Sequence, residues 1–507
     1  MASYILSIDQ GTSSTKTIIF NEEGKPIAKG SELLKSYFLE GGLVEQEPEE
    51  IYTNVLASVS KCIDAFKANG GNVADIKACG ISNQRETFVV WDEDGKPLHN
   101  AIVWQCKRSV KICERLKSEG QEAFIKDKTG LIVDPYFSGT KLIWLYENVD
   151  KVRKAIDEGR AYFGTIDTWL LYMLTNGKSY LTDYTNASRT LFFNISSLNW
   201  DKGLLSMFGL SKLNLPQAKP SSYLFGRSNF NGLLNEPIAI TGMIGDSHAA
   251  AFGEGCFLPG TAKATMGTGS SILMNIGNDL RASKNGMITT ICWSTEDRVD
   301  YAFEGVIVSC GATIEWLKND VGIIADSRQT EAMAKSVTDN NGVYLVPAFS
   351  GLGAPHWDMN RKASITGLTF DCNKNHIVRA ALESIPYQIK DVIEAMEQDA
   401  EIELQELMVD GGITSNKFVL QFLSDLLQRQ IINIGMPDVS ALGAAYMAGL
   451  KAGIFKDLSH LQSLNSDKTF IYPNENSDNV KRWYAGWRAV IEGGSTPVKR
   501  QPVSHSL

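Results

Sequence analysis

The amino-acid sequence predicts an α/β protein built from two similar halves. Each half opens with an apolar strand, a turn rich in glycine and hydroxyl side chains, and a second strand. In each half, further strands then alternate with segments of helical periodicity. The length of 507 residues allows about two to four domains at roughly 150 residues per domain. Two large halves fit that range.

The first half begins with a predicted β-hairpin. The strands SYILSID and TKTIIF flank its turn, and the polar stretch NEEGKP leads to a third strand, PIAKGSE. Apolar residues three and four apart predict helices at 49–68, 137–149 and 204–207. Segment 78–103 is predicted as strands (ACGISNQ, TFVVWD and HNAIVWQ), and the acidic DEDGKP turn between the last two indicates a second hairpin.

The second half repeats this organisation. Segment 260–276 is predicted as a strand, a Gly/Thr/Ser turn and a strand. The strand NGVYLVPAF follows, then a long helix at 376–396, the strand ELMVDGG and a helix at 417–427. Strands alternating with helices favour an α/β arrangement in this half as well.

The boundary between the halves is expected in the glycine-containing stretch 253–258. It gives an N-terminal domain at 1–253 and a C-terminal domain at 254–507. The last dozen residues, TPVKRQPVSHSL, are expected to form a loose tail.

Composition excludes several classes of protein. The chain has 49 Lys+Arg against 58 Asp+Glu, a net charge of −9, which is the wrong sign for binding nucleic acid or an anionic membrane. No apolar run approaches about 18 residues, and the N-terminus lacks a basic region and a cleavage site. The scattered cysteines and histidines favour neither a zinc site nor a disulfide framework. We therefore expect a cytoplasmic protein that binds no nucleic acid and no membrane.

The turn of the first hairpin carries side chains suited to phosphate. Thr12, Ser13 and Ser14 supply hydroxyls and backbone amides, Lys16 adds positive charge, and Asp9 is suited to holding magnesium through water. Considered alone, the same turn is an ordinary polar hairpin turn.

Two features of the second half favour a nucleotide site over that alternative. The turn GTGS at 267–270 matches the first turn in position, and MVDGGITSN at 408–416 reads as a strand, paired glycines and a helix. The paired glycines would let an adenine ring lie against the backbone, although a tight βα loop has the same pattern. Two such hairpins are best explained by a nucleotide bound between the halves.

These blocks together resemble the FGGY carbohydrate kinases, and among them the glycerol kinases. The resemblance extends from Ile5 to about Phe455. The matching blocks, in chain order, are DQGTSSTK, GISNQRETFVVWD, NAIVWQ, YFSGTKLIWLYEN, GTIDTWL, DYTNASRT, AFSGLGAPHWD, ASITGLTFDCNKNHIVRAALE and ALGAAYMAG.

The resemblance implies two actin/hexokinase-like (ribonuclease H-like) domains with an interdomain catalytic cleft, in which ATP and the acceptor meet. Asp246 matches the catalytic aspartate, which takes the proton of the acceptor hydroxyl as that oxygen attacks the γ-phosphorus. Asp9 and Asp246 match the positions that hold Mg²⁺. The implied ATP-binding residues are Thr12, Ser13, Ser14, Lys16, Thr268, Gly311, Glu315, Gly412 and Asn416.

The resemblance also implies an acceptor site. Arg85 and Glu86 would hydrogen-bond the acceptor hydroxyls, and Trp104 would pack against its carbon chain. Trp104 as plain core and Arg85–Glu86 as a solvated charge pair remain alternatives. The implied substrate-binding residues are Arg85, Glu86, Trp104, Tyr136, Asp246, Ser247 and Ser271.

Three positions depart from the glycerol kinase pattern. Ser247 stands where the family usually has Gln, Ser271 where it has Phe, and Cys106 where it has Asp. The two serines leave space on the acceptor side, so the site is expected to admit a polyol at least one CHOH unit longer than glycerol. Alternatively, His248 or Met266 refills the space. Cys106 is interpreted as a packing change.

The leading hypothesis is ATP-dependent phosphorylation of a terminal hydroxyl of glycerol or a closely related small polyol. The alternatives are a kinase of a larger polyol or a pentulose and, from another class, a nucleotide-dependent binding or regulatory protein on an actin-like fold. The expected cofactors and partners are ATP, Mg²⁺ and a small-molecule polyol. A homo-oligomer, specifically a dimer, is also expected.

Overall fold

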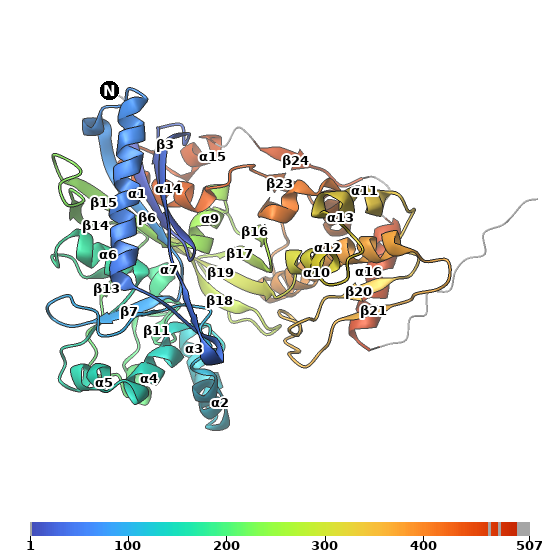
Figure 1. The fold of residues 1–507 in the computed structure, drawn as a ribbon, viewed down its shortest axis with the longest axis horizontal. Helices are drawn as coiled ribbons and strands as arrows, with labels where there is room; N and C mark the ends of the chain where they lie inside the picture. Colours follow the sequence, from blue (N-terminus) through green and yellow to red (C-terminus); the bar gives the residue numbers. More distant parts are fainter. Residues whose placement is uncertain (1–2, 465–467, 475–477, 494–507) are drawn as a thin grey trace, which may run out of the picture.

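The structure, a computed structural model, describes residues 3–464, 468–474 and 478–493. The tail expected at 496–507 lies outside the described residues. Figure 1 shows the N-terminal half, blue to green, beside the C-terminal half, yellow to red. Within the described ranges, no helix has both the length and the apolar character needed to cross a membrane.

A six-stranded sheet forms the core of the first half, in the order β14-β15-β6-β1-β2-β3. Its strands are β1 (Tyr4–Gln10), β2 (Ser14–Phe20), β3 (Pro26–Leu33), β6 (Ile76–Asn83), β14 (Ser222–Ser228) and β15 (Ile238–Gly245). The predicted opening hairpin and third strand are confirmed, since β1, β2 and β3 pair antiparallel. β6 pairs parallel with both β1 and β15. The carboxyl ends of these three parallel strands therefore meet at one edge, where ligands of open α/β sheets bind.

A seven-stranded sheet forms the core of the second half, in the order β18-β19-β17-β16-β22-β23-β24. Its strands are β16 (Thr261–Met266), β17 (Ser270–Gly277), β18 (Ile288–Thr295), β19 (Arg298–Ile307), β22 (Glu406–Asp410), β23 (Ile431–Asn433) and β24 (Thr469–Ile471). The opening hairpin β16–β17 is antiparallel, and β22 pairs parallel with β16 and β23. This is the arrangement of the first sheet, so the prediction of two similar α/β halves is confirmed.

A further five-stranded sheet, β4-β5-β8-β7-β9, belongs to the first half. The predicted second hairpin lies in it, since β7 and β8 pair antiparallel, but the sheet as a whole was not predicted. Its strands, and those of three small two-stranded sheets, are β4 (Tyr37–Leu39), β5 (Leu43–Gln46), β7 (Phe88–Trp91), β8 (Ala101–Ile102), β9 (Tyr162–Thr165), β10 (Leu181–Asp183), β11 (Phe193–Asn194), β12 (Asn199–Trp200), β13 (Gln217–Lys219), β20 (Tyr344–Val346) and β21 (Ser364–Thr366). The predicted strands HNAIVWQ and NGVYLVPAF shorten to β8 and β20. The chain turns directly after each, where the amides of Cys106 and Ala348 bond the carbonyls of Val103 and Val346.

The predicted helices all form, with bounds within a few residues of expectation except at the ends of α12. The helices are α1 (Pro48–Ala68), α2 (Val110–Ser118), α3 (Glu122–Thr129), α4 (Ser138–Asn148), α5 (Asp150–Asp157), α6 (Ile166–Leu174), α7 (Tyr184–Ala187), α8 (Lys202–Met207), α9 (Asp246–Glu254), α10 (Gly311–Asn319), α11 (Thr330–Lys335), α12 (Lys374–Ala400), α13 (Lys417–Leu427), α14 (Val439–Lys451), α15 (Leu458–Leu464) and α16 (Asp478–Ile491). Short 3₁₀ turns are η1 (Glu40–Gly42), η2 (Val73–Asp75), η3 (Ser327–Gln329) and η4 (Gly412–Ser415).

Two helices join the halves. α14 belongs to the second half in sequence but packs on β1, β6 and β15 of the first sheet, whereas α9 contacts β16, β17 and β18 of the second (Figure 1). The two helices pack against each other so closely that a Cβ at Gly443 would lie 1.8 Å from the carbonyl oxygen of Ala249. Only glycine permits this approach. α9 begins at Asp246, so the helix that joins the halves also positions the predicted catalytic carboxylate.

Candidate functional site

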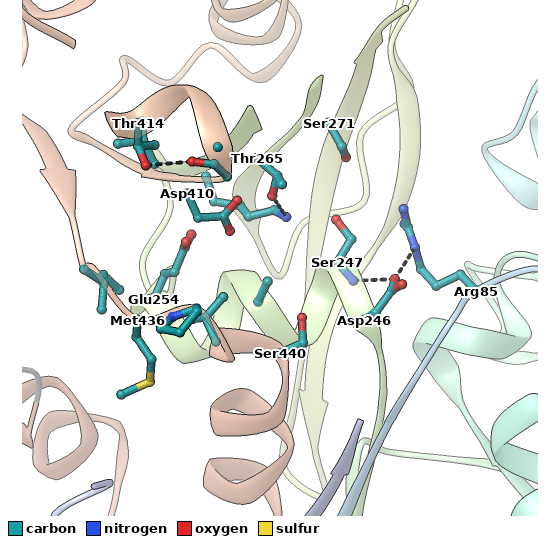
Figure 2. A pocket seen from close by; sticks show the side chains of 18 of the residues that line it. Arg85, Asp246, Ser247, Glu254, Thr265, Ser271, Asp410, Thr414, Met436 and Ser440 are labelled. Carbon is teal, nitrogen blue, oxygen red and sulfur yellow. Dashed lines mark hydrogen bonds and ion pairs between the residues drawn. The ribbon is translucent and has the colours of Figure 1, made fainter. Parts of the chain in front are cut away.

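A cavity of about 720 Å³ lies between the halves, at the carboxyl edge of the first sheet. It is lined by residues from β17, β22 and the start of α14 as well as by the first half (Figure 2). All the predicted acceptor-binding residues line this one cavity: Arg85, Glu86, Trp104, Tyr136, Asp246, Ser247 and Ser271. The fold thus brings together side chains that are far apart in the sequence.

Asp246 presents a carboxylate to this cavity. Its side chain is 39% exposed, while that of Arg85 beside it is 5% exposed. Oδ1 of Asp246 accepts a hydrogen bond of 2.6 Å from the Ser247 amide, and Arg85 Nε lies 3.3 Å from the same oxygen. Gly245 makes room for this arrangement, because a Cβ there would lie 2.7 Å from Arg85 Cγ. A substrate entering the cavity can therefore reach a carboxylate that accepts a hydrogen bond from the Ser247 amide and forms an ion pair with Arg85.

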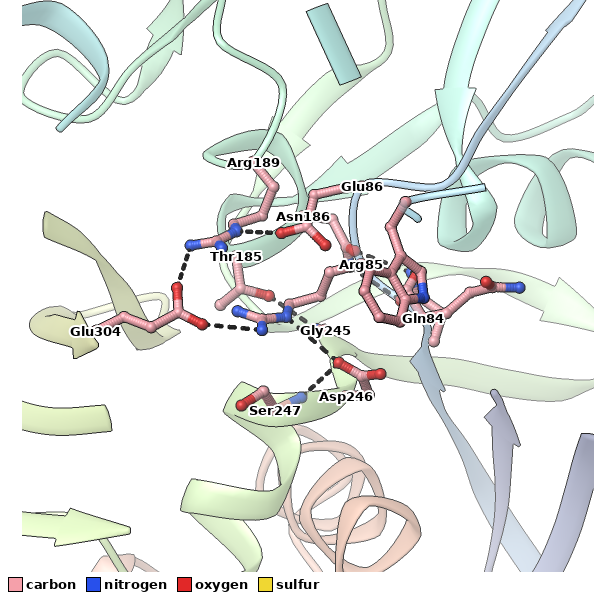
Figure 3. Close-up of polar contacts among 12 residues, drawn as sticks. Gln84, Arg85, Glu86, Thr185, Asn186, Arg189, Gly245, Asp246, Ser247 and Glu304 are labelled. Atoms are coloured by element: carbon pink, nitrogen blue, oxygen red, sulfur yellow. Dashed lines mark hydrogen bonds and ion pairs between the residues drawn. The ribbon is translucent and has the colours of Figure 1, made fainter. Parts of the chain in front are cut away.

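Arg85 belongs to a buried network of charges that spans both halves (Figure 3). Arg85 pairs with Glu304 of β19 at 2.9 Å, and Arg189 pairs with the other oxygen of Glu304 at 2.6 Å. Arg189 Nε also donates to Glu86 at 2.5 Å. Arg189, Glu86 and Glu304 are each at most 1% exposed. Glu304 therefore orients Arg85, and Arg189 orients Glu86, without either facing solvent.

The electrostatics of this network differ from one carboxylate to the other. Burial raises the pKa of Glu304, but the Arg189 and Arg85 guanidiniums outweigh burial and hold it well below its usual range. Burial keeps the pKa of Glu86 above its usual range despite the two arginines. Burial, followed by the charge of Arg85, lowers the pKa of His248 well below its usual value, so this imidazole is neutral. Glu304 is thus the firmly ionised partner of both arginines.

Two aromatic rings form a wall of the cavity. Trp104 and Tyr136 pack edge to face with ring centroids 5.6 Å apart, and Trp104 Nε1 donates to Thr12 Oγ1 at 2.9 Å. Behind them, Lys141 Nζ donates to the carbonyl oxygens of Trp104 and Tyr136, and burial lowers the pKa of Lys141 to about 8. Glu86, which follows Arg85 in the chain, has a left-handed backbone with φ 61°. Such strained conformations are concentrated in binding sites.

A second cavity, of about 860 Å³, adjoins the first and is built in a different way. The amide of Gly311, at the start of α10, donates to the Gly267 carbonyl at 2.9 Å, which docks this helix on the β16–β17 turn. Gly412 lines both cavities, and a Cβ there would meet no atom within 4 Å. The predicted nucleotide-binding residues of the second half all line this cavity: Thr268, Gly311, Glu315, Gly412 and Asn416.

The predicted residues of the first phosphate turn are placed differently. Thr12 lines the first cavity, whereas Ser13, Ser14 and Lys16 line neither cavity. Lys16 Nζ instead pairs at 3.0 Å with Asp438, which precedes α14 and also pairs with Lys29 at 2.5 Å. A nucleotide contact by Lys16 would therefore require a rearrangement of this ion pair.

Asp9 also lies outside the cavity lining, next to the catalytic candidate. Burial, and then the nearby charge of Asp246, raises the pKa of Asp9 to about 6. Across the described parts of the chain, no three His, Cys, Asp or Glu side chains gather as a metal site. The donors available for a cation are therefore two neighbouring carboxylates.

Cys106 lies away from the acceptor. It is 1% exposed and contacts Arg108, whose Nε lies 3.0 Å from the sulfur. Its interpretation as a packing change agrees with this position.

Sequence reasoning missed several buried ionisable side chains of the site, among them Arg189, Glu304 and Lys263. Arg189 and Glu304 are each the single charged residue of an apolar run, RTLFFNI and YAFEGVIV. Because charges inside a protein are normally paired, a lone charge in such a run could have indicated a buried ion pair. Lys263 lines the first cavity at 2% exposure and donates to Thr265 at 2.6 Å.

Comparison with known proteins gives consistent results. The sequence is 43% identical to the glycerol kinase of Alkaliphilus metalliredigens (strain QYMF) over 492 residues, which cover 97% of this chain and 98% of that protein. It is 46% identical to the glycerol kinase of Thermoanaerobacter pseudethanolicus (strain ATCC 33223 / 39E) over 494 residues, with coverage of 97% and 98%. The fold is similar to the crystal structure of Plasmodium falciparum glycerol kinase with ADP, with a TM-score of 0.92, 36% identity, and coverage of 98% of this chain and 99% of that one. The expected two-domain kinase fold is thereby confirmed.

The family is shown by both halves of the sequence. Residues 4–253 match the N-terminal domain of the FGGY family of carbohydrate kinases. Residues 262–452 match the C-terminal domain of the same family. Together with the near full-length relatives, these matches establish that the chain belongs to the FGGY family of carbohydrate kinases.

Proposed function

We propose that this chain transfers the γ-phosphoryl group of MgATP to a terminal hydroxyl of glycerol or a closely related small polyol, giving the polyol phosphate and ADP. The observation that carries the proposal is the Asp246 carboxylate, held by Arg85 and facing a cavity that shares Gly412 with a second cavity. The arrangement suits a small acceptor in the first cavity and a nucleotide in the second. The relatives described as glycerol kinases support the same acceptor class.

In the proposed reaction, Asp246 is the general base. The acceptor oxygen forms a bond to the γ-phosphorus while the bond from that phosphorus to the β,γ-bridging oxygen breaks, and ADP leaves. The hydroxyl proton passes to the Asp246 carboxylate and then to solvent. Arg85 and Glu86 would bind the other hydroxyls, one as donor and one as acceptor. Their buried partners keep both side chains in place before the substrate arrives.

Magnesium would enter with the nucleotide as MgATP. The donors present fit this ion, because Mg²⁺ prefers oxygen ligands and because burial, and then the nearby charge of Asp246, raises the pKa of Asp9 to about 6, a cost that a cation beside Asp9 would offset. Bound there, the ion would neutralise charge on the phosphates. Asp9 and Asp246 are the side chains proposed to face it.

For the nucleotide, we propose binding by both hairpin turns and the glycine loop. The first turn would contribute Thr12, Ser13, Ser14 and Lys16, the last after release from Asp438. The second cavity would hold the adenosine, contacted by the residues Thr268, Gly311, Glu315, Gly412 and Asn416. The domain division at 253/254, a dimeric state and a cytoplasmic location also stay predictions.

The proposal is tested by ADP release from MgATP with the full chain. Addition of glycerol or another small polyol should start ADP release that depends on the polyol concentration. ADP release that no polyol stimulates would favour the nucleotide-dependent binding protein over the kinase.

A further inference from the structure

Two serine hydroxyls of the acceptor cavity have no hydrogen-bond partner. Ser247 Oγ and Ser271 Oγ are both buried and unpartnered in the structure, although both residues line the cavity. A buried hydroxyl without a partner costs free energy, so such a group is usually satisfied by water or a ligand. Two of them in one cavity indicate that a polar part of the substrate belongs there.

The two serines come from opposite sides of the cavity. Ser247 lies in the first turn of α9, directly after the proposed base. Ser271 lies on β17 of the second half, paired with Thr265 and Val306 on the neighbouring strands. Figure 2 shows the two hydroxyls turned toward the space between them. A substrate hydroxyl in that space would contact both halves.

Neither of the two side chains expected as candidates to refill this space, His248 and Met266, lines the acceptor cavity. His248 is the nearest bulky candidate, but it is fully buried and does not line the cavity. It packs behind Gly245, where a Cβ would lie 3.5 Å from His248 Nδ1. Met266 lines the second cavity instead. Neither residue therefore occupies the lining of the acceptor cavity, which Ser247 and Ser271 share.

We propose that the acceptor site takes a polyol one CHOH unit longer than glycerol, a tetritol, with its additional hydroxyl bonded between Ser247 and Ser271. A serine hydroxyl both donates and accepts, which matches a neutral alcohol. An anionic substituent suits the site less well, because the carboxylates of Asp246, Glu86 and Asp410 outnumber the cations of Arg85 and Lys263 in its lining. The inference rests on the proposed function and specifies its substrate.

The experiment compares kcat/KM for glycerol, erythritol and both enantiomers of threitol, with MgATP and the full chain. We expect kcat/KM for at least one tetritol to exceed that for glycerol by roughly 10-fold or more. A difference of this size is typical when a pocket fits one additional group of the substrate. Preference for glycerol over every tetritol would overturn the inference while leaving the proposed function intact. Absence of reaction with all of these polyols would contradict both the inference and the proposed function.

Variants connect the preference to the serines. Ser271→Phe should lower the tetritol-to-glycerol ratio of kcat/KM by roughly 10-fold or more, because the ring fills the space. Ser271→Ala, which adds no bulk, should lower the same ratio by removing one hydroxyl partner. Ser270→Ala is the matched control, since Ser270 is also buried with an unpartnered hydroxyl but does not line the cavity. A ratio unchanged in both Ser271 variants would overturn the assignment.

Discussion

The two cavities of the cleft, proposed for the acceptor and for the nucleotide, are built in different ways. At the acceptor end, charged side chains are buried and paired with one another, as in the chain of Arg85, Glu304, Arg189 and Glu86. At the proposed nucleotide end, the glycines Gly267, Gly311 and Gly412, several hydroxyls and the start of α10 form part of a lining that also holds apolar side chains such as Trp316 and charged ones such as Glu315 and Arg328. The acceptor site therefore depends on locked side-chain geometry, and the nucleotide site on backbone shape.

The difference has energetic consequences. Removing one partner of a buried ion pair typically costs about 3–5 kcal/mol, because the other charge is left without compensation. A backbone site is instead sensitive to added bulk. Mutations at the two ends should consequently separate into changes of polyol affinity and changes of ATP affinity.

The largest effect is expected for Asp246→Asn, at the point where both ends meet. The variant keeps the shape but lacks the base, so kcat should fall by roughly 10²- to 10⁴-fold. Nucleotide affinity, measured by calorimetry with ADP, should stay close to wild type. A kcat near that of wild type would show that Asp246 is not the general base.

Glu304→Gln tests the locked geometry of the acceptor end. Glu304 orients Arg85 without facing the substrate, so the polyol KM should rise by roughly 10- to 100-fold, a loss of about 1.4–3 kcal/mol. The KM for ATP should change little. Equal increases of the KM values for polyol and ATP would indicate a general structural defect. They would contradict the expected separation between the acceptor end and the nucleotide end.

Gly412→Ala tests the backbone site. The added methyl would meet no protein atom within 4 Å, so thermal stability should stay near wild type. The same methyl would project into space proposed for the nucleotide, and the KM for ATP should rise by roughly 10-fold. Gly411→Ala serves as a contrast: its φ is 92° and its Cβ would lie 2.4 Å from the Met266 carbonyl oxygen, so it should lose stability. An unchanged KM for ATP in Gly412→Ala would show that the nucleotide does not bind against this loop.

The smallest effect concerns acid stability. The pKa of Glu304 is held below its usual range by Arg189 and Arg85, although burial opposes them. Its ionised form therefore stabilises the fold at neutral pH, and this contribution is lost as the pH falls below the usual glutamate value of about 4.3. In Glu304→Gln, unfolding free energy from urea titrations should decline less steeply than in wild type between about pH 5 and pH 3. An equally steep decline of the unfolding free energy in wild type and in Glu304→Gln would contradict the low pKa of Glu304.

The turns of the proposed nucleotide end carry the more local sequence signal, although Ser13, Ser14 and Lys16 line neither cavity. Glycines and hydroxyls in turns between strands have a local sequence pattern, and the hairpins at β1–β2 and β16–β17 formed as predicted. Arg189 and Glu304 could not be assigned in the same way, because pairing between a loop after α7 and a strand of the other half depends on tertiary structure. The left-handed backbone of Glu86 and the pairing of Lys16 with Asp438 are likewise set by packing. The five-stranded sheet as a whole was missed because strands as short as Tyr37–Leu39 carry almost no periodicity.

The central claim is phosphoryl transfer to a polyol, and ³¹P NMR of the full chain with MgATP and glycerol or a tetritol tests it most directly. The account predicts that a phosphomonoester signal grows as the γ-phosphate signal of ATP declines, in equal amounts, and that Asp246→Asn greatly slows both changes. Formation of inorganic phosphate alone, or unchanged ATP with every polyol, would contradict it.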